Sequence, residues 1–234
     1  MAGIIKKELS QFFRTMSGYI FLAVFVAISG FYFLAVNIVG KSGDIKDFFS
    51  AISPVLLFLV PIITMRAYSE ERRQHTDELL LTSPTGITTI ILGKFFACMI
   101  MLLIATAVIW IYAIILALHG SRAPMDTFAN WFGFVLLTGA YISIGLFVSV
   151  LAESQIIAAV VSYAVLLFMY VIDSSVSADT GRFAAVIMRA VSLKGHYTDF
   201  TYGILSAANV VYFLSITAFF LFLSVFALEH KRLD

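Results

Sequence analysis

Six stretches of the chain contain no Asp, Glu, Lys or Arg, and each is close to the length that a membrane crossing requires. A helix needs about 20 apolar residues to cross a hydrocarbon core about 30 Å thick. Alternation typical of a β-barrel is absent, so the backbone can satisfy its hydrogen bonds in lipid only as helices. The sequence therefore predicts an all-α integral membrane protein in which residues 1–234 form one domain with six transmembrane helices. The predicted spans are Thr15–Gly40, Phe48–Met65, Phe95–Leu118, Thr127–Ala152, Ser154–Ile172 and Phe200–Leu228.

Composition excludes a water-soluble globule. Hydrophobic residues make up 61% of the chain and charged residues 12%, whereas soluble domains average about 45–50% and about 25%. The formal net charge of +1 provides no field that would attract nucleic acid. The single cysteine, Cys98, lies in an apolar run and excludes an intrachain disulfide and a multi-cysteine metal site.

Basic residues favour one orientation of the chain. An even number of spans places both termini on the same side, and Lys and Arg are enriched in cytoplasmic segments. With the termini inside, nine basic residues lie in inner segments and six in outer ones. We therefore expect both termini to be cytoplasmic.

Two segments are predicted to lie along the membrane without crossing it. Residues 3–14 carry an apolar stripe at helical spacing and a polar side formed by Lys6, Lys7, Glu8 and Gln11, which is typical of an interfacial helix. In residues 174–199 an apolar group lies between Arg182 and Arg189, and this group is too short to span. We expect a re-entrant helix there, with an ordinary surface loop as the alternative.

The sequence lacks the residues that several membrane activities need. Gly93-Lys94 is followed by Phe95 and does not form a phosphate-binding loop, so the chain is not expected to hydrolyse ATP itself. Charged residues near the spans, such as Lys94 and Glu153, are predicted at the interfaces, which disfavours a proton-coupled carrier. The four histidines show no metal-ligand spacing. We expect no catalytic, cofactor-binding or metal-binding residue.

The polar segment between the second and third spans carries the most information. Glu70, Glu71 and the two following arginines are expected to extend the second helix beyond the lipid. Thr76 can cap a new short helix over 76–83, in which Asp77 and Glu78 stabilise the positive end of the dipole. Pro84 ends this helix.

Leu79 and Leu80 of this short helix have two possible environments. Exposed leucines beside acidic residues are typical of a surface that docks into a partner's groove. The alternative is that they fold back onto the membrane or the spans. A third possibility for the polar segment is catalysis, because Glu70-Glu71 resembles the acidic pair of prenyl-protein-type intramembrane proteases, but His75 stands where those enzymes continue with Arg.

The order Glu70-Glu-Arg-Arg-x-x-Thr-Asp-Glu-Leu-Leu-x-Thr-Ser-Pro84, followed by Ile91-Leu-Gly-Lys94, resembles the coupling-helix region of type-2 ABC exporter permeases. The resemblance extends to Lys6-Lys7-Glu8-Leu9, to Gly145–Gln155 and to Tyr202-Gly-Ile-Leu205. Within that family the chain is most similar to the gliding-motility-associated and copper-processing-associated branch. Many members have Gly at the position of His75, so the start of the coupling helix is the main departure.

The resemblance implies a dimer of permeases, with the first and fifth spans near the interface, and a coupling helix seated in a separate ABC ATPase subunit. The outer re-entrant segment would form a gate. Carried over by position, the gate residues are Phe183, Ile187 and Met188, and the ATPase-coupling residues are Glu70, Glu71, Thr76, Asp77, Glu78, Leu79, Leu80 and Pro84.

The function expected from this resemblance is that of a permease subunit of an ATP-driven exporter in a bacterial inner membrane. ATP and Mg would bind to the partner ATPase, and this chain would hold no cofactor. The other expected partners are membrane lipid, a second permease subunit, identical or different, and an accessory membrane protein with a periplasmic domain. The alternatives are a mechanotransmitting subunit that relays ATPase motion to such a partner without moving solute, and an ion-coupled carrier.

Overall fold

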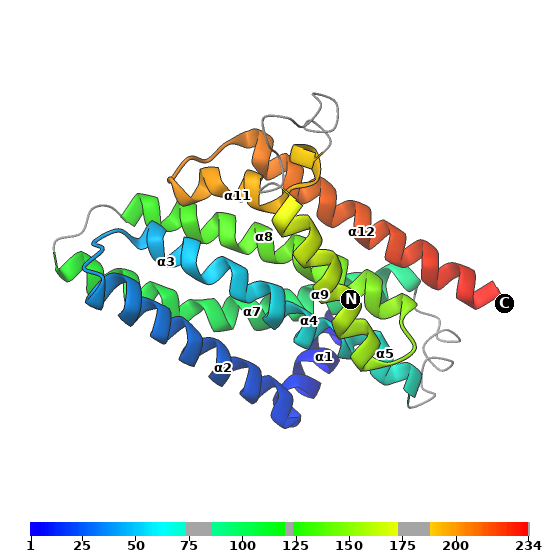
Figure 1. The fold of residues 1–234 in the computed structure, drawn as a ribbon. Coiled ribbons are helices and arrows are strands. Elements are labelled where there is room, and N and C mark those ends of the chain that lie inside the picture. Colours follow the sequence, from blue (N-terminus) through cyan, green and yellow to red (C-terminus); the bar gives the residue numbers. More distant parts are fainter. Residues whose placement is uncertain (74–85, 120–123, 173–187, 234) are drawn as a thin grey trace.

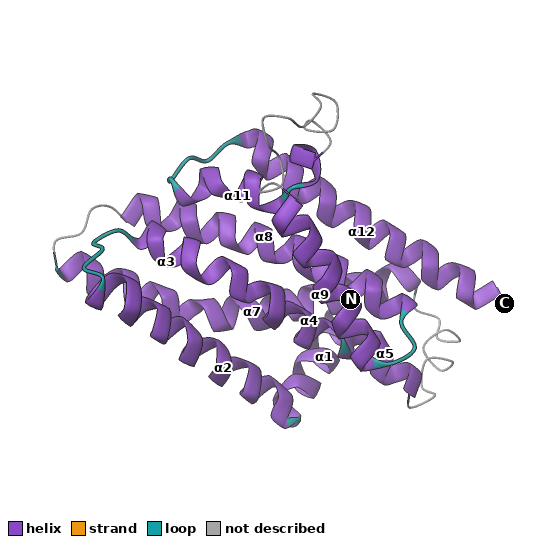
Figure 2. Cartoon of the chain, viewed as in Figure 1, coloured by secondary structure: helices purple, strands orange, loops and turns teal. Residues whose placement is uncertain are grey.

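The computed structural model describes residues 1–73, 86–119, 124–172 and 188–233, and this part of the chain contains helices and no strand (Figure 2). The long uncharged runs form most of these helices, as their apolar composition predicts. The elements are α1 (Ala2–Arg14), α2 (Met16–Tyr32), the π-helix η1 (Phe33–Val39), α3 (Ile45–Ile52), the 3-10 helix η2 (Ser53–Val55), α4 (Leu56–Thr64), α5 (Arg66–Arg73), α7 (Ile87–Leu118), α8 (Pro124–Leu151), α9 (Gln155–Val171), α11 (Leu193–Thr201) and α12 (Ala207–Leu233).

Five stretches of the described residues are long and apolar enough to cross a membrane. The fifth predicted run forms α9, an apolar helix of 17 residues, so the six-span topology stays a prediction. The prediction of an all-helical, multi-pass membrane protein is confirmed. The five stretches are Gly18–Val39, Ile45–Ser69, Ile87–Leu118, Thr127–Leu151 and Ala207–His230.

The predicted span boundaries that differ most from the structure are the starts of the third and sixth spans. The third span was expected from Phe95, but α7 begins at Ile87 because the residues before Lys94 are also apolar and continue the helix. The sixth was expected from Phe200, but α11 ends at Thr201 and α12 begins at Ala207. A turn between them contains Gly203 at a positive φ of 75°, which glycine adopts without steric cost.

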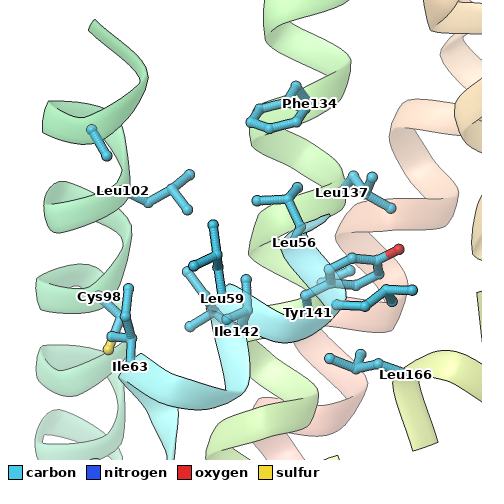
Figure 3. Close-up of a cluster of buried hydrophobic side chains, with 14 of the residues drawn as sticks. Leu56, Leu59, Ile63, Cys98, Leu102, Phe134, Leu137, Tyr141, Ile142 and Leu166 are labelled. Atoms are coloured by element: carbon cyan, nitrogen blue, oxygen red, sulfur yellow. The ribbon is translucent and has the colours of Figure 1, made fainter. Parts of the chain in front are cut away.

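α8 lies at the centre of the bundle and contacts α3, α4, α5, α7, α9, α11 and α12 (Figure 1). α1 packs mainly against α7, and also contacts α2. Apolar side chains of α4, α7, α8 and α9 converge on a common core (Figure 3). The labelled members of this core are Leu56, Leu59, Ile63, Cys98, Leu102, Phe134, Leu137, Tyr141, Ile142 and Leu166.

The second candidate span is not one continuous helix. Pro54 is the second residue of the short 3-10 turn η2, and Pro61 lies inside α4, where it lacks the N–H of a helical hydrogen bond. A further break at Met65 separates α4 from α5. Ser149 of α8 lies against this break, where its Oγ accepts a hydrogen bond from the Tyr68 amide at 3.2 Å and donates to the Met65 carbonyl at 3.4 Å. The kink in the span therefore has a side-chain partner on the central helix.

Different helix ends gather at the two opposite ends of the bundle. The end of η1, the beginning of α3, the end of α7 and the beginning of α8 lie together at one end (Figure 1). α5 and the C-terminal part of α12 lie at the opposite end, which we call the α5 end. In the predicted orientation, the α5 end is the cytoplasmic one.

Candidate functional site

Most of the predicted ATPase-coupling residues lie outside the described residues. Glu70 and Glu71 belong to α5, which extends the second candidate span as the sequence indicates, but only their backbone is described. The coupling helix over 76–83 and its contacts stay a prediction. The residues of this group that fall outside the described ranges are Thr76, Asp77, Glu78, Leu79, Leu80 and Pro84.

The predicted outer gate is described only at its end. Phe183 and Ile187 lie outside the described residues, whereas Met188 is described and half-buried. Met188 begins a helical turn, in which its carbonyl accepts a hydrogen bond of 3.0 Å from the Ser192 amide. Ser192 then caps α11 by accepting the Gly195 amide. A re-entrant position for this segment stays a prediction.

α11 is nevertheless firmly attached to the bundle. Its Asp199 carboxylate accepts a hydrogen bond of 2.7 Å from the Asn209 amide group at the start of α12. Tyr197 is 2% exposed, and this burial raises the pKa of its phenol. The last helix before α12 is therefore held by polar and apolar contacts together.

The strongest polar feature of the described chain is a buried cation next to the predicted coupling segment. Lys94 of α7 is 2% exposed. Its Nζ donates to Glu8 Oε1 of α1 at 3.0 Å and to the Ala67 carbonyl of α5 at 2.5 Å, and it lies 4.8 Å from the centre of the Tyr68 ring. We call Glu8, Ala67, Tyr68, Lys94 and Ser149 the inner junction.

One prediction about the inner junction is wrong: Glu8 was expected on the polar side of the first helix, but it is buried. Lys94 was expected at the membrane interface, which stays a prediction; the structure places it about two turns inside α7, because the helix begins at Ile87. A signal was present in the sequence, since Glu8 is four residues after Ile4 and four before Phe12, and therefore shares their apolar face.

Close helix contacts surround the inner junction. A Cβ at Gly93 would lie 2.7 Å from Ile4 Cγ2, so α1 and α7 approach through a residue without a side chain. Gly145 of α8 likewise has no room for a Cβ beside Thr64 at the end of α4. Small residues allow such close packing of membrane helices. Gly145 and Ser149 thus lie where α8 contacts the broken second span.

The inner junction joins three helices through one buried charged pair. A charged pair that is removed from water is favourable only when its geometry and hydrogen bonds are good, and separating it leaves an uncompensated charge. Lys94 therefore holds α1 and the start of α5 against α7, and residues 74–85 connect α5 to α7. Among the described residues, no group of His, Cys, Asp and Glu is placed to hold a metal ion.

Comparison with known proteins identifies the family of the chain. None of the curated proteins matches the chain. The model of the family described as "ABC-2 family transporter protein" matches residues 39–187, which is more than half of the chain. Members of this family are membrane components that act with an ABC ATPase subunit. The chain belongs to the ABC-2 family of transporter proteins and is a multi-pass permease.

Proposed function

We propose that this permease couples ATP hydrolysis in a separate ATPase subunit to export of a substrate across the bacterial inner membrane. The observation that carries the proposal is the inner junction, which ties α5 and α7, the helices on either side of the predicted coupling segment, to each other and to α1. ATP and Mg bind to the partner in this proposal.

Force on the coupling segment would have a defined route into the membrane. Residues 74–85 connect α5 to α7, so a displacement caused by the ATPase reaches both helices. Because Lys94 holds the Ala67 carbonyl and the Glu8 carboxylate, α1, α5 and α7 move as one rigid unit. α1 passes the motion to α2, and α5 passes it to α8 through Ser149.

The proposed assembly contains a second permease subunit beside α2 and α9, the first and fifth of the sequence-predicted spans. Both helices present large exposed apolar side chains, among them Phe31 at 67%, Ile156 at 77% and Phe168 at 65% exposure. A protein partner or lipid tails can cover such a surface. In this proposal Phe183, Ile187 and Met188 contribute to the outer gate.

A double substitution in the coupling segment tests the proposal. Glu78→Ala combined with Leu79→Arg removes one acidic contact and places a charge in the expected ATPase groove. We expect that less ATPase co-purifies with the variant. We also expect that its ATP turnover is no longer coupled to transport. Thr198→Ala, at an exposed position of α11, is the control and should leave both unchanged.

Three outcomes separate the possibilities. Unchanged association and unchanged coupling in the double variant would contradict the proposal. Coupled ATPase activity in the unmodified complex without solute movement into vesicles would favour a mechanotransmitting subunit instead. Transport that is driven by an ion gradient without any ATPase would favour a carrier.

A further inference from the structure

An apolar pocket lies beside the inner junction, between α1, α2, α4 and α7. Eight of its lining residues are apolar, and the ninth is Arg66, the first residue of α5. Phe12 comes from α1, Val24 from α2, Ile63 from α4 and Met101 from α7. The pocket encloses about 130 Å³, which accommodates a segment of one acyl chain but not a complete lipid.

The pocket opens on the outer surface of the helix bundle, between α2 and α4. Three lining residues of α2 and α4 are substantially exposed, with Ile20 at 57%, Val24 at 38% and Ile62 at 48%. These residues belong to stretches that are apolar enough to cross a membrane. Ile20 and Val24 lie on the same face of α2 as Phe31. A lipid tail can therefore enter from this side where the second permease subunit proposed above leaves the part of α2 near α1 uncovered.

Arg66 gives the pocket a preference for a negatively charged ligand. Its side chain is half-buried, and within the described residues no ion pair involves it. An arginine beside an apolar surface gains most from a group that accepts two parallel hydrogen bonds, such as a phosphate. Since α5 continues beyond the apolar part of the span, Arg66 lies where a headgroup would meet the pocket.

We propose that this pocket is a binding site for an anionic phospholipid of the leaflet at the α5 end, with one acyl chain between α2 and α4 and the phosphate on Arg66. A polar solute does not fit the apolar lining, and a neutral hydrocarbon would form no ion pair with Arg66. The bound lipid would fill the space between α2 and the α1–α7 pair, next to the inner junction. The site is independent of the export function proposed above.

Lipid retention by the full-length protein tests this site. The protein, purified in detergent, is incubated with phosphatidylglycerol or phosphatidylcholine carrying the same acyl chains, and bound lipid is measured by native mass spectrometry. We expect phosphatidylglycerol to be preferred. Arg66→Gln should lower that preference about tenfold, the effect of about one charge-assisted hydrogen bond.

Three further variants make the result decisive. Val24→Phe should reduce retention of both lipids because its ring occupies the pocket. Arg66→Lys should lower the preference for phosphatidylglycerol less than Arg66→Gln, because it keeps the charge but loses the fork geometry. Lys6→Gln removes an exposed charge from α1 and should change nothing.

If Lys6→Gln and Arg66→Gln lowered the preference for phosphatidylglycerol equally, the preference would come from general surface charge, and the proposed site would be overturned. Unchanged retention in Val24→Phe would show that only lipid around the outside of the bundle had been measured, and would overturn it as well. If Arg66→Gln does not yield folded protein, Val24→Phe and Arg66→Lys decide the question.

Discussion

α8 and α12 are almost equally apolar, yet they occupy opposite environments. Their membrane-crossing stretches have mean hydropathies of 2.2 and 2.4, but 78% of the α8 stretch is buried in the protein and only 11% of the α12 stretch. α8 carries small and hydroxyl-bearing residues at its contacts, such as Gly133, Gly145 and Ser149, whereas α12 exposes Phe219, Phe222 and Phe226. In a membrane, size and polarity distinguish the inside of the protein from its periphery better than hydropathy does, because lipid and core are equally apolar.

The largest effect is expected where a charge is buried beside α8. Lys94→Met leaves the Glu8 carboxylate buried without its cation, so it should lower the free energy of unfolding by about 3–5 kcal/mol. Combining Lys94→Met with Glu8→Leu removes both charges and should recover much of this loss. Unfolding in mixed detergent micelles measures the change. Additive losses in the double variant would show that the two side chains do not interact.

A smaller effect is expected from adding one methyl group to α8. Gly145→Ala places a Cβ against Thr64, where neighbouring atoms must move, and should cost about 1–3 kcal/mol. Gly139→Ala is the matched control, since a Cβ there would meet Met99 Sδ at 3.7 Å, an ordinary contact. Thermal unfolding of the two variants gives the comparison. Equal stability of both variants would contradict the close approach of α4 and α8.

The smallest effect is expected on the outside of α12. Phe222 is 66% exposed, so Phe222→Ala should change the free energy of unfolding of the isolated chain by no more than about 0.5 kcal/mol. Phe213 on the same helix is fully buried, and Phe213→Ala should cost about 3 kcal/mol or more. A loss at Phe222 as large as that at Phe213 would mean that protein, rather than lipid, covers this face of α12.

The sequence predicted the helical class and most spans because uncharged runs of this length have few alternatives in lipid. It began the third span after Lys94 because a charge was taken to end a span, whereas α7 begins at Ile87 and Lys94 is buried against Glu8, 86 residues away in the chain. No local pattern contains that pairing. The periodicity around Glu8 did place it on an apolar face, but its charge suggested solvent exposure.

Other features also depend on contacts between distant segments. The break at Met65 is accommodated by Ser149 of α8, and the boundary between α11 and α12 is stabilised by Asp199 and Asn209. Arg66 was recognised only as a contribution to the positive-inside count. Its place beside an apolar pocket follows from the packing of α1, α2, α4 and α7, which the order of residues alone does not give.

The central claim is that α1, α5 and α7 move as one rigid unit when the ATPase acts. The most direct test joins α1 to α7 by a disulfide between Ile4→Cys and Gly93→Cys in a Cys98→Ala background. A Cβ at position 93 would lie 3.0 Å from Ile4 Cβ, whereas disulfides need about 3.5–4.5 Å, so the two helices must separate by roughly half an ångström or more to form it. Transport-coupled ATP turnover of the complex is then measured before and after reduction. Our account predicts the same coupled turnover in both states; turnover that is blocked by the cross-link and restored by reduction would show that α1 and α7 must move apart.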